Sequence, residues 1–116
     1  MANALFTVYA DRIGEWRFRF ACAEGTQRLR ASEGYNAKVN ALKAIDSVRR
    51  NVLEAKRFDY KQNSRGKHFF TVKARNGNIL AVSRNHAELD QLEEDAGVIA
   101  RQAPAADVRE EAYVGT

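Results

Sequence analysis

The sequence has a single cysteine and no long hydrophobic run, and each of these features excludes a class of protein. The lone thiol, Cys22, cannot form an internal disulfide, and it is typical of a reducing compartment such as the cytoplasm. No apolar stretch approaches the ~20 residues that a membrane-spanning helix needs. The opening MANALFTVYADR lacks a basic segment followed by an apolar run, so no secretory signal is predicted. We therefore expect a cytoplasmic protein with no membrane partner.

The composition is that of one folded domain spanning residues 1–116. Hydrophobic residues make up 45% of the chain and charged residues 29%, as in ordinary globular proteins. The charge is uneven, because residues 1–86 hold 17 Lys and Arg against 7 Asp and Glu, whereas residues 87–116 hold 2 against 8. The basic part either attracts polyanions or is neutralised by the acidic part within the fold. Neutralisation is the ordinary outcome, and we favour it.

Two segments of the chain resemble each other. Residues beginning at Phe6 and at Phe58 match at a constant spacing of 52 and, after one deletion, of 51. The matched pairs are Phe6 with Phe58, Gly14 with Gly66, Phe18 with Phe70, Gly25 with Gly77, and Ser32 with Ser83. Glycines at matched positions indicate hairpin turns that need a positive φ. We predict internal repeats at about 5–54 and 57–104, followed by an acidic tail or a short last strand within 105–116.

Strict alternation of apolar and basic residues makes Glu15–Cys22 the clearest strand. A period of two places its bulky apolar side chains on one face and Arg17 and Arg19 on the other. The same alternation in the next strand, at 28–31, turns Leu29 inward and Arg28 and Arg30 outward. The inward residues of the first strand are Trp16, Phe18, Phe20 and Cys22, and the other expected strands are 5–10, 58–61, 68–74 and 79–82, with 107–114 either a last strand or a frayed tail.

A helix is expected after each group of three strands. The first begins after Asn36 as its N-cap, and the second begins after Asn85, with Glu88 completing a capping box, and ends before Pro104. Their apolar stripes need a surface to cover, and the aromatic face of the sheet is the only candidate. We therefore predict an α+β domain with one antiparallel sheet and two helices packed on one face. The stripes are Ala41, Leu42, Ile45 and Val48 in the first helix, and Leu89, Leu92, Ala96 and Ile99 in the second.

Several runs of residues resemble the YegP-like family of small bacterial proteins. They are GEWRFRFA at 14–21, SEGY at 32–35, Lys38, IDSVRRN at 45–51, FTVKARNGNIL at 70–80 and Ser83. The resemblance covers nearly the whole chain up to Pro104. It implies a β-β-β-α-β unit that is present in tandem, with the two units joined in one antiparallel sheet about a pseudo-twofold axis. Members with one unit would reach the same arrangement by dimerising.

The second repeat departs from the family pattern. Arg84-Asn85-His86 replaces the turn that precedes the first helix, and Leu89 stands where the first repeat has Lys38. If that turn and lysine serve a ligand, only the first repeat retains the site. The resemblance brings no assigned activity with it.

An outward row of arginines is the most suggestive surface. Arg17, Arg19, Arg28 and Arg30 could bind phosphates, and Tyr9 or Phe69 could stack on bases beside them. The alternative is a solvated sheet face whose arginines pair with carboxylates such as Glu15, Glu24 and Glu33, and we favour it. Lys38 could likewise hold an anion beside the Ser32–Tyr35 turn, although this turn reads more simply as helix-capping structure.

The remaining reactive residue types form no recognisable catalytic or metal-binding set. Cys22 lies on the inward face and has no histidine near it in the sequence. His68 and His86 with one thiol do not have the spacing of metal ligands, and Glu93–Asp95 is typical of a solvated helix face. No glycine-rich phosphate loop is present. We therefore expect no catalytic residue, metal or cofactor.

Two functional hypotheses follow from the sequence. The first is a non-enzymatic structural or interaction module that binds a protein partner or a second copy of itself. The alternative is sequence-tolerant nucleic-acid binding through the basic sheet face, with Arg17, Arg19, Arg28, Arg30 and Lys38 as the candidate binding residues.

Overall fold

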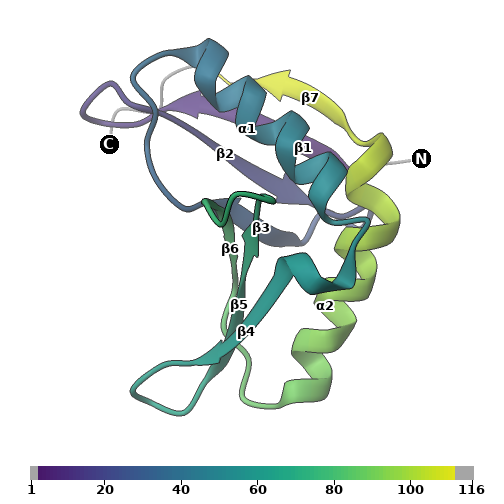
Figure 1. Cartoon of the computed structure of the whole chain (residues 1–116). Coiled ribbons are helices and arrows are strands. Elements are labelled where there is room, and N and C mark those ends of the chain that lie inside the picture. Colours follow the sequence, from purple (N-terminus) through teal and green to yellow (C-terminus); the bar gives the residue numbers. More distant parts are fainter. Residues whose placement is uncertain (1–2, 112–116) are drawn as a thin grey trace.

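The computed structural model describes residues 3–111, and the alternating segments form the strands of one sheet (Figure 1). Two α-helices and two short 3-10 helices complete the fold. The strands are β1 (Leu5–Ala10), β2 (Trp16–Ala21), β3 (Gln27–Ala31), β4 (Phe58–Gln62), β5 (His68–Lys73), β6 (Ile79–Ser83) and β7 (Asp107–Glu110). The helices are α1 (Lys38–Asn51), η1 (Ala55–Arg57), α2 (Leu89–Gln102) and η2 (Ala103–Ala105).

The seven strands lie in the order β4-β5-β6-β3-β2-β1-β7. Strands β1 to β6 pair antiparallel with their neighbours, as predicted, whereas β7 runs parallel to β1. The prediction of a purely antiparallel sheet was therefore wrong, and the sheet is mixed. After α2 the chain reaches the outer edge of β1, and β7 runs there in the same direction as β1. A connection that contains a helix allows such parallel pairing. The strand β7 lies within the predicted 107–114, of which residues 112–114 are outside the described part.

Both helices pack on the aromatic face of the sheet. Phe6, Phe18 and Phe20 from β1 and β2 are fully buried, and so is Phe70 from β5. The rings of Phe6 and Phe20 lie 5.0 Å apart between centroids, a separation at which tilted aromatic pairs add to the stabilisation from burial alone. The helical residues of the same core include Ala41, Ile45 and Val48 of α1 and Leu92 and Ile99 of α2.

Both helices begin later than predicted. The N-cap of α1 is Ala37, which makes no side-chain capping bond, rather than Asn36. The N-cap of α2 is Glu88, which exchanges capping-box hydrogen bonds with Gln91, so the predicted N-cap Asn85 was also wrong. The reason is the same at both sites, because the chain is still paired with the sheet shortly before each helix. Tyr35 forms a β-bridge with Trp16, and His86 forms one with His68.

The hairpin turns follow the glycine prediction. Gly14, Gly25, Gly66 and Gly77 all have positive φ, between 78° and 90°. The two outer hairpins are also closed by side chains, because the Asp11 carboxylate accepts hydrogen bonds from the amides of Ile13 and Glu15. The side-chain oxygen of Asn63 does the same for Arg65 and Lys67. Within residues 3–111, no helix has the length and apolarity to cross a membrane.

The packing of α2 predicts a large difference between two leucines of this helix. Leu92 is fully buried, whereas Leu89 is 45% exposed. We expect Leu92→Ala to lower the free energy of unfolding by about 2–5 kcal/mol through lost burial and an internal cavity. Leu89→Ala should change it by about 0.5 kcal/mol or less. Urea denaturation measures both, and similar midpoints for the two variants would contradict this packing.

Candidate functional site

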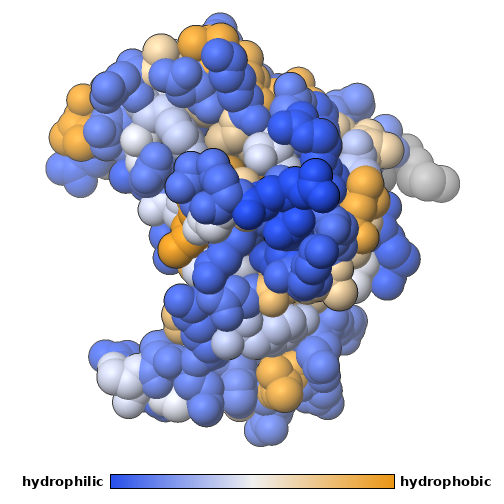
Figure 2. All heavy atoms as spheres, viewed as in Figure 1, coloured by the Kyte–Doolittle hydropathy of each residue, from blue (hydrophilic) through white to orange (hydrophobic). Residues whose placement is uncertain are grey.

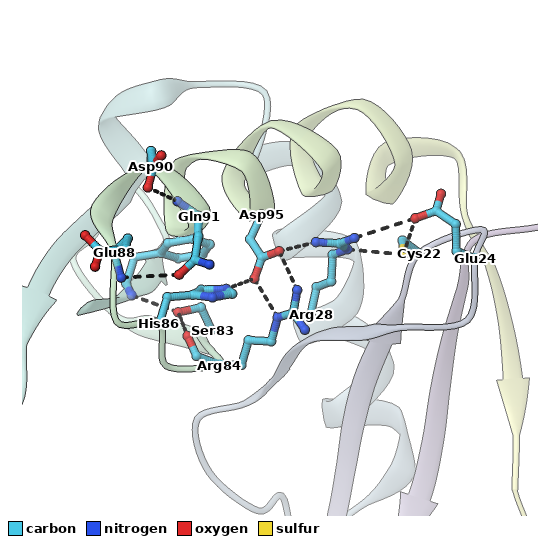
Figure 3. Close-up of polar contacts among 11 residues, drawn as sticks. Cys22, Glu24, Arg28, Ser83, Arg84, His86, Glu88, Asp90, Gln91 and Asp95 are labelled. Atoms are coloured by element: carbon cyan, nitrogen blue, oxygen red, sulfur yellow. Dashed lines mark hydrogen bonds and ion pairs between the residues drawn. The ribbon is translucent and has the colours of Figure 1, made fainter. Parts of the chain in front are cut away.

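A buried carboxylate, Asp95, lies at the centre of a cluster of polar side chains (Figure 3). Asp95 projects from α2 and is 0% exposed. Its Oδ2 accepts a hydrogen bond from Arg84 Nε at 2.8 Å and lies 2.7 Å from His86 Nε2. Its Oδ1 accepts hydrogen bonds from Arg84 Nη2 at 3.0 Å and from Arg28 Nη1. The predicted solvated face Glu93–Asp95 was therefore wrong for Asp95, whereas Glu93 and Glu94 are exposed.

Arg28 reaches this cluster because of an irregularity in β3. The pairing of β2 with β3 passes from Phe20↔Leu29 to Ala21↔Gln27, so Arg28 has no partner across the strands. Such a bulge re-aims one side chain relative to simple alternation. Arg28 is consequently only 9% exposed and pairs with a residue of the helix layer. The prediction that Arg28 points outward with Arg30 was wrong for this reason.

The cluster extends from Arg28 to the only cysteine. Arg28 Nε donates a hydrogen bond to Cys22 Sγ at 3.1 Å, and the thiol in turn lies 3.3 Å from Glu24 Oε2. The bond to Cys22 raises the pKa of Arg28, the bonds to Asp95 raise it further, and burial opposes both. Cys22 is buried as predicted, but it has a cationic neighbour that the sequence did not reveal, because the bulge brings it there.

The neighbours of Asp95 lower its pKa. Burial alone raises the pKa of this carboxyl, but the hydrogen bonds from Arg84, His86 and Arg28 more than compensate, so the net pKa is below its ordinary value. Arg28 belongs to β3, whereas Arg84 and His86 belong to the segment between β6 and α2. The cluster therefore fastens α2 to the middle of the sheet.

The remaining predicted binding residues are mostly engaged by carboxylates. Arg17 Nε donates to Asp11 Oδ2 at 2.8 Å, which lowers the pKa of Asp11. Arg19 bonds Glu111, and its guanidinium lies 5.0 Å from the Tyr9 ring centroid. Lys38 Nζ is 2.8 Å from Glu110 Oε1 and 5.8 Å from the centroid of the Trp16 ring. Arg30 is exposed, and no ion pair to it occurs within residues 3–111.

The acidic C-terminal part thus docks on the basic part. Glu110 and Glu111 reach Lys38 and Arg19, and Asp95 reaches Arg28 and Arg84. The carbonyl of Ala106 accepts a further hydrogen bond from the Arg49 guanidinium. In these contacts the acidic residues neutralise basic residues of the same chain, which is the outcome that we favoured from the charge distribution.

The Ser32–Tyr35 turn connects β3 to α1 through tight packing. Ser32 Oγ donates to the carbonyl of Ile79 at 2.9 Å. A Cβ placed on Gly34 would lie 2.8 Å from the Cβ of Glu15, so this position has room only for glycine. The turn also borders an open groove of about 1090 Å³ between α1 and the β5–β6 hairpin. The face of the molecule seen in Figure 2 is mostly hydrophilic. The groove is lined largely by neutral polar side chains.

The two ends of the sheet differ. At one end the outer edge of β1 is covered by β7. At the other end the outer edge of β4 has no neighbouring strand within the described residues. Beside this edge lies a largely apolar slot of about 310 Å³ between β4 and α2. Its lining residues are Val52, Leu53, Ala55, Phe58, Tyr60, Ala96, Gly97 and Ala100.

The backbone of β4 presents hydrogen-bonding groups along its open edge. The amide of Asn63 donates to the carbonyl of Lys67, which fixes the bonding pattern of the β4–β5 hairpin. Since this pattern alternates, the amides of Asp59 and Lys61 face β5, and those of Tyr60 and Gln62 face outward. The amide of Phe58 donates to the carbonyl of Ala55 in η1. An uncovered edge of this kind is a template for a further strand. Sequence reasoning missed this site, because strand order decides which edges are covered.

Comparison with known proteins identifies the family. Residues 11–59 match DUF1508, a domain of unknown function. The chain is 32% identical over 108 residues to the UPF0339 protein in the ptx operon 5′ region of Stutzerimonas stutzeri, an alignment covering 93% of this chain and 96% of that protein. The chain belongs to the UPF0339 family. A shorter UPF0339 protein of Agrobacterium fabrum is 44% identical over 54 residues, which are 47% of this chain and 86% of that protein.

The fold of UPF0339 proteins is known from solution structures. The structure of YegP from Escherichia coli matches with a TM-score of 0.89 at 26% identity, covering 97% of this chain and 96% of that chain. A UPF0339 protein of Shewanella oneidensis matches with a TM-score of 0.88 at 17% identity, covering 95% and 92%. The resemblance to YegP-like proteins predicted from the sequence is confirmed. The function of this family is unknown.

The Asp95 cluster makes the stability of the UPF0339 chain sensitive to one carboxylate. Asp95→Asn removes the buried charge that pairs with Arg28 and Arg84, and we expect it to cost about 3–5 kcal/mol of unfolding free energy near neutral pH. The matched control is Glu94→Gln, the exposed neighbour, which should change it by about 0.5 kcal/mol or less. Because the folded pKa of Asp95 is lowered, its contribution is present above the unfolded pKa and is lost as the pH falls through the folded value.

The measurement is chemical denaturation of both variants and the parent protein from about pH 7 to about pH 2. The gap between the parent protein and Asp95→Asn should narrow at the acidic end. A gap that stays constant with pH would show that Asp95 is not ionised in the fold.

Proposed function

We propose that this UPF0339 protein is a non-enzymatic, cytoplasmic interaction module that binds protein partners through the open edge of β4. The observation that carries the proposal is the difference between the two ends of the sheet. Addition of a strand to an exposed edge is a common mode of protein recognition, in which backbone hydrogen bonds give affinity and side-chain pockets give specificity. The β4 edge has both, because the apolar slot lies next to it.

The chain itself shows how such an edge is filled. At the other end β7 pairs in parallel with β1, with Val108 opposite Phe6 and the Glu111 amide bonded to the Val8 carbonyl. Two polar side chains, Lys38 and Arg19, hold the acidic residues of that strand. The β4 end has Leu89 at the position that matches Lys38, and Thr71 at the one that matches Arg19. A partner strand at β4 is therefore held by apolar contact more than by charge.

The topology explains why β4 is an edge strand, whereas β1 has β7 beside it. The chain that leaves α2 supplies β7 to β1, whereas the chain that leaves α1 becomes β4 itself. No segment between α1 and β4 is available to cover the edge of β4. The half-exposed Tyr60 on this edge, 42% exposed, is the kind of aromatic residue that is enriched at protein interfaces.

Nucleic-acid binding through the sheet face has less support. Three of the four arginines proposed for it are engaged by carboxylates, and Arg28 lies on the opposite side of the sheet. An enzymatic role also has less support. In the Asp95 cluster, the carboxylate, guanidinium and imidazole groups are bonded to one another rather than to open space.

We further propose that the chain is one domain made of two tandem units, about residues 5–54 and 57–104, related by a pseudo-twofold axis between β3 and β6. Both units have the same irregularity, because Arg28 and Leu80 are each left without a cross-strand partner. The bridges Trp16↔Tyr35 and His68↔His86 also correspond. The 54 residues aligned with the Agrobacterium relative have about the length of one unit and make up most of that protein.

The tandem arrangement predicts that an apolar pair can replace the buried ion pair. Asp95 matches Ala44 at the spacing of 51, and Arg28 matches Leu80 at the spacing of 52. Arg28 of the first unit pairs with Asp95 of the second, and the corresponding residues are Leu80 of the second unit and Ala44 of the first. Asp95→Ala alone should cost about 3–5 kcal/mol, because buried Arg28 loses its partner. Adding Arg28→Leu should recover most of this loss. Thermal unfolding compares the single and double variants, and a double variant less stable than Asp95→Ala would contradict the equivalence.

A photo-crosslinking residue at position 60 tests the proposed interaction. Crosslinking in living bacterial cells should produce adducts with protein at Tyr60, because that side chain lies on the open edge. The control position is Ile13, which is 79% exposed at the tip of the β1–β2 hairpin and has no open strand edge beside it. Adducts at position 60 that are absent at position 13 support the proposal. Equal yields, or no protein adduct at position 60, overturn it.

Titration with labelled RNA and DNA tests the alternative. Binding that weakens steeply as salt rises would indicate phosphate contacts and would favour nucleic-acid recognition. Absence of such binding, together with crosslinks at position 60, is the result that we expect.

A further inference from the structure

We propose that the partner of the β4 edge is a second copy of this chain, paired antiparallel through β4 about a twofold axis at Tyr60. This inference rests on the proposed function, because it names the occupant of the same edge. In a twofold dimer formed through one edge strand, the same strand of both copies makes the contact. The strand therefore has to be complementary to an identical strand that runs in the opposite direction.

The outward backbone groups of β4 allow such pairing. Tyr60 and Gln62 present their amides and carbonyls along the open edge, and Phe58 presents only its carbonyl, because its amide donates to the carbonyl of Ala55 in η1. With Tyr60 on the twofold axis, it exchanges two hydrogen bonds with the partner's Tyr60. The carbonyl of Phe58 accepts a hydrogen bond from the amide of the partner's Gln62. The free outward amides of Tyr60 and Gln62 then each have a carbonyl opposite them.

The charges of β4 select this register. Asp59 and Lys61 lie on the face away from the helices, where Asp59 also contacts Lys73 at 2.8 Å. With the axis at Tyr60, Asp59 lies opposite the partner's Lys61, and Lys61 opposite the partner's Asp59. Moving the axis to residue 59 places two aspartates opposite each other, and moving it to residue 61 places two lysines opposite each other. Opposite charges across neighbouring strands stabilise a sheet, and like charges destabilise it.

The apolar face of the strand is complementary as well. Tyr60 lies on the helix side, with its ring centroid 5.6 Å from that of Phe70. In the proposed register the two Tyr60 rings are neighbours at the mouths of the two apolar slots. The contact buries the exposed part of Tyr60 in both copies and joins the two sheets into one continuous sheet with all helices on the same side. Because the strand is short, we expect a weak, reversible dimer.

A charge-exchange experiment tests the register. Lys61→Asp gives an edge with two aspartates, and Asp59→Lys gives an edge with two lysines. Each variant alone should dimerise at least about tenfold more weakly than the parent chain, because two attractive cross-strand pairs become repulsive. An equimolar mixture of the two variants should form a heterodimer. The double variant, which exchanges the two charges, should dimerise like the parent chain.

Sedimentation velocity from about 10 μM to about 1 mM, the range of weak transient association, measures these equilibria. The matched controls are Lys43→Asp on α1 and Glu94→Lys on α2, two exposed charge reversals away from β4 that should leave dimerisation unchanged. Thermal unfolding checks that every variant is folded. The double variant guards against misfolding, since it contains both substitutions and is expected to regain association.

Each result decides the question. Loss of dimerisation in both single variants with recovery in their mixture supports the proposed register. A parent chain that stays monomeric at about 1 mM overturns self-pairing, and crosslinks from position 60 to other proteins would then leave the interaction function standing. Dimerisation that is unaffected by either substitution places the contact on another surface and also overturns the inference.

Discussion

Asp95 has no access to water, and its hydrogen-bonding partners come from two segments that are far apart in the sequence. Arg28 comes from the middle of the sheet, and Arg84 and His86 come from the segment that leads into α2. The helix can therefore be seated in only one position along the sheet, because a shift by one turn would leave a buried charge unpaired. Apolar packing alone tolerates such shifts more readily.

The second constraint is geometrical, because an open sheet has two ends. In this fold the two ends differ, because β7 covers the outer edge of β1, whereas the outer edge of β4 has no neighbouring strand within the described residues. The segment after α2 reaches the β1 edge, and its acidic residues are held there by Lys38 and Arg19. The segment between α1 and β4 is too short to form a further strand beside β4. Natural proteins place charged side chains on exposed edge strands to prevent unwanted pairing. Asp59 and Lys61 disfavour most partner strands in this way, but they match the same two residues of a second, antiparallel copy of β4.

Much of the fold could be predicted from local patterns. Alternation located the strands, helical spacing located α1 and α2, and paired glycines located the turns, because each of these signals reflects the conformation of a few neighbouring residues. Tyr35 and His86 show where this fails, since their pairing with β2 and β5 delays each helix beyond the residues that look like caps. The prediction that Arg28 points outward was wrong for a related reason. Simple alternation assumes that every residue of β3 pairs with β2, and the bulge interrupts this pairing at Arg28. The parallel β7 and the open β4 edge depend on strand order, which no short stretch of residues encodes.

The position of β7 has a consequence for the order in which the molecule can be completed. Leu5 and Asp107 are partners across neighbouring strands, yet almost the entire described chain lies between them. During synthesis β1 emerges early and remains without its outer neighbour until the segment after α2 has been made, while β2 and β3 can fold against it at once. Local hairpins form quickly, and pairings between distant segments form slowly. A growing chain therefore passes through a stage in which both rims of the sheet are bare, and docking of the late acidic segment brings that stage to an end.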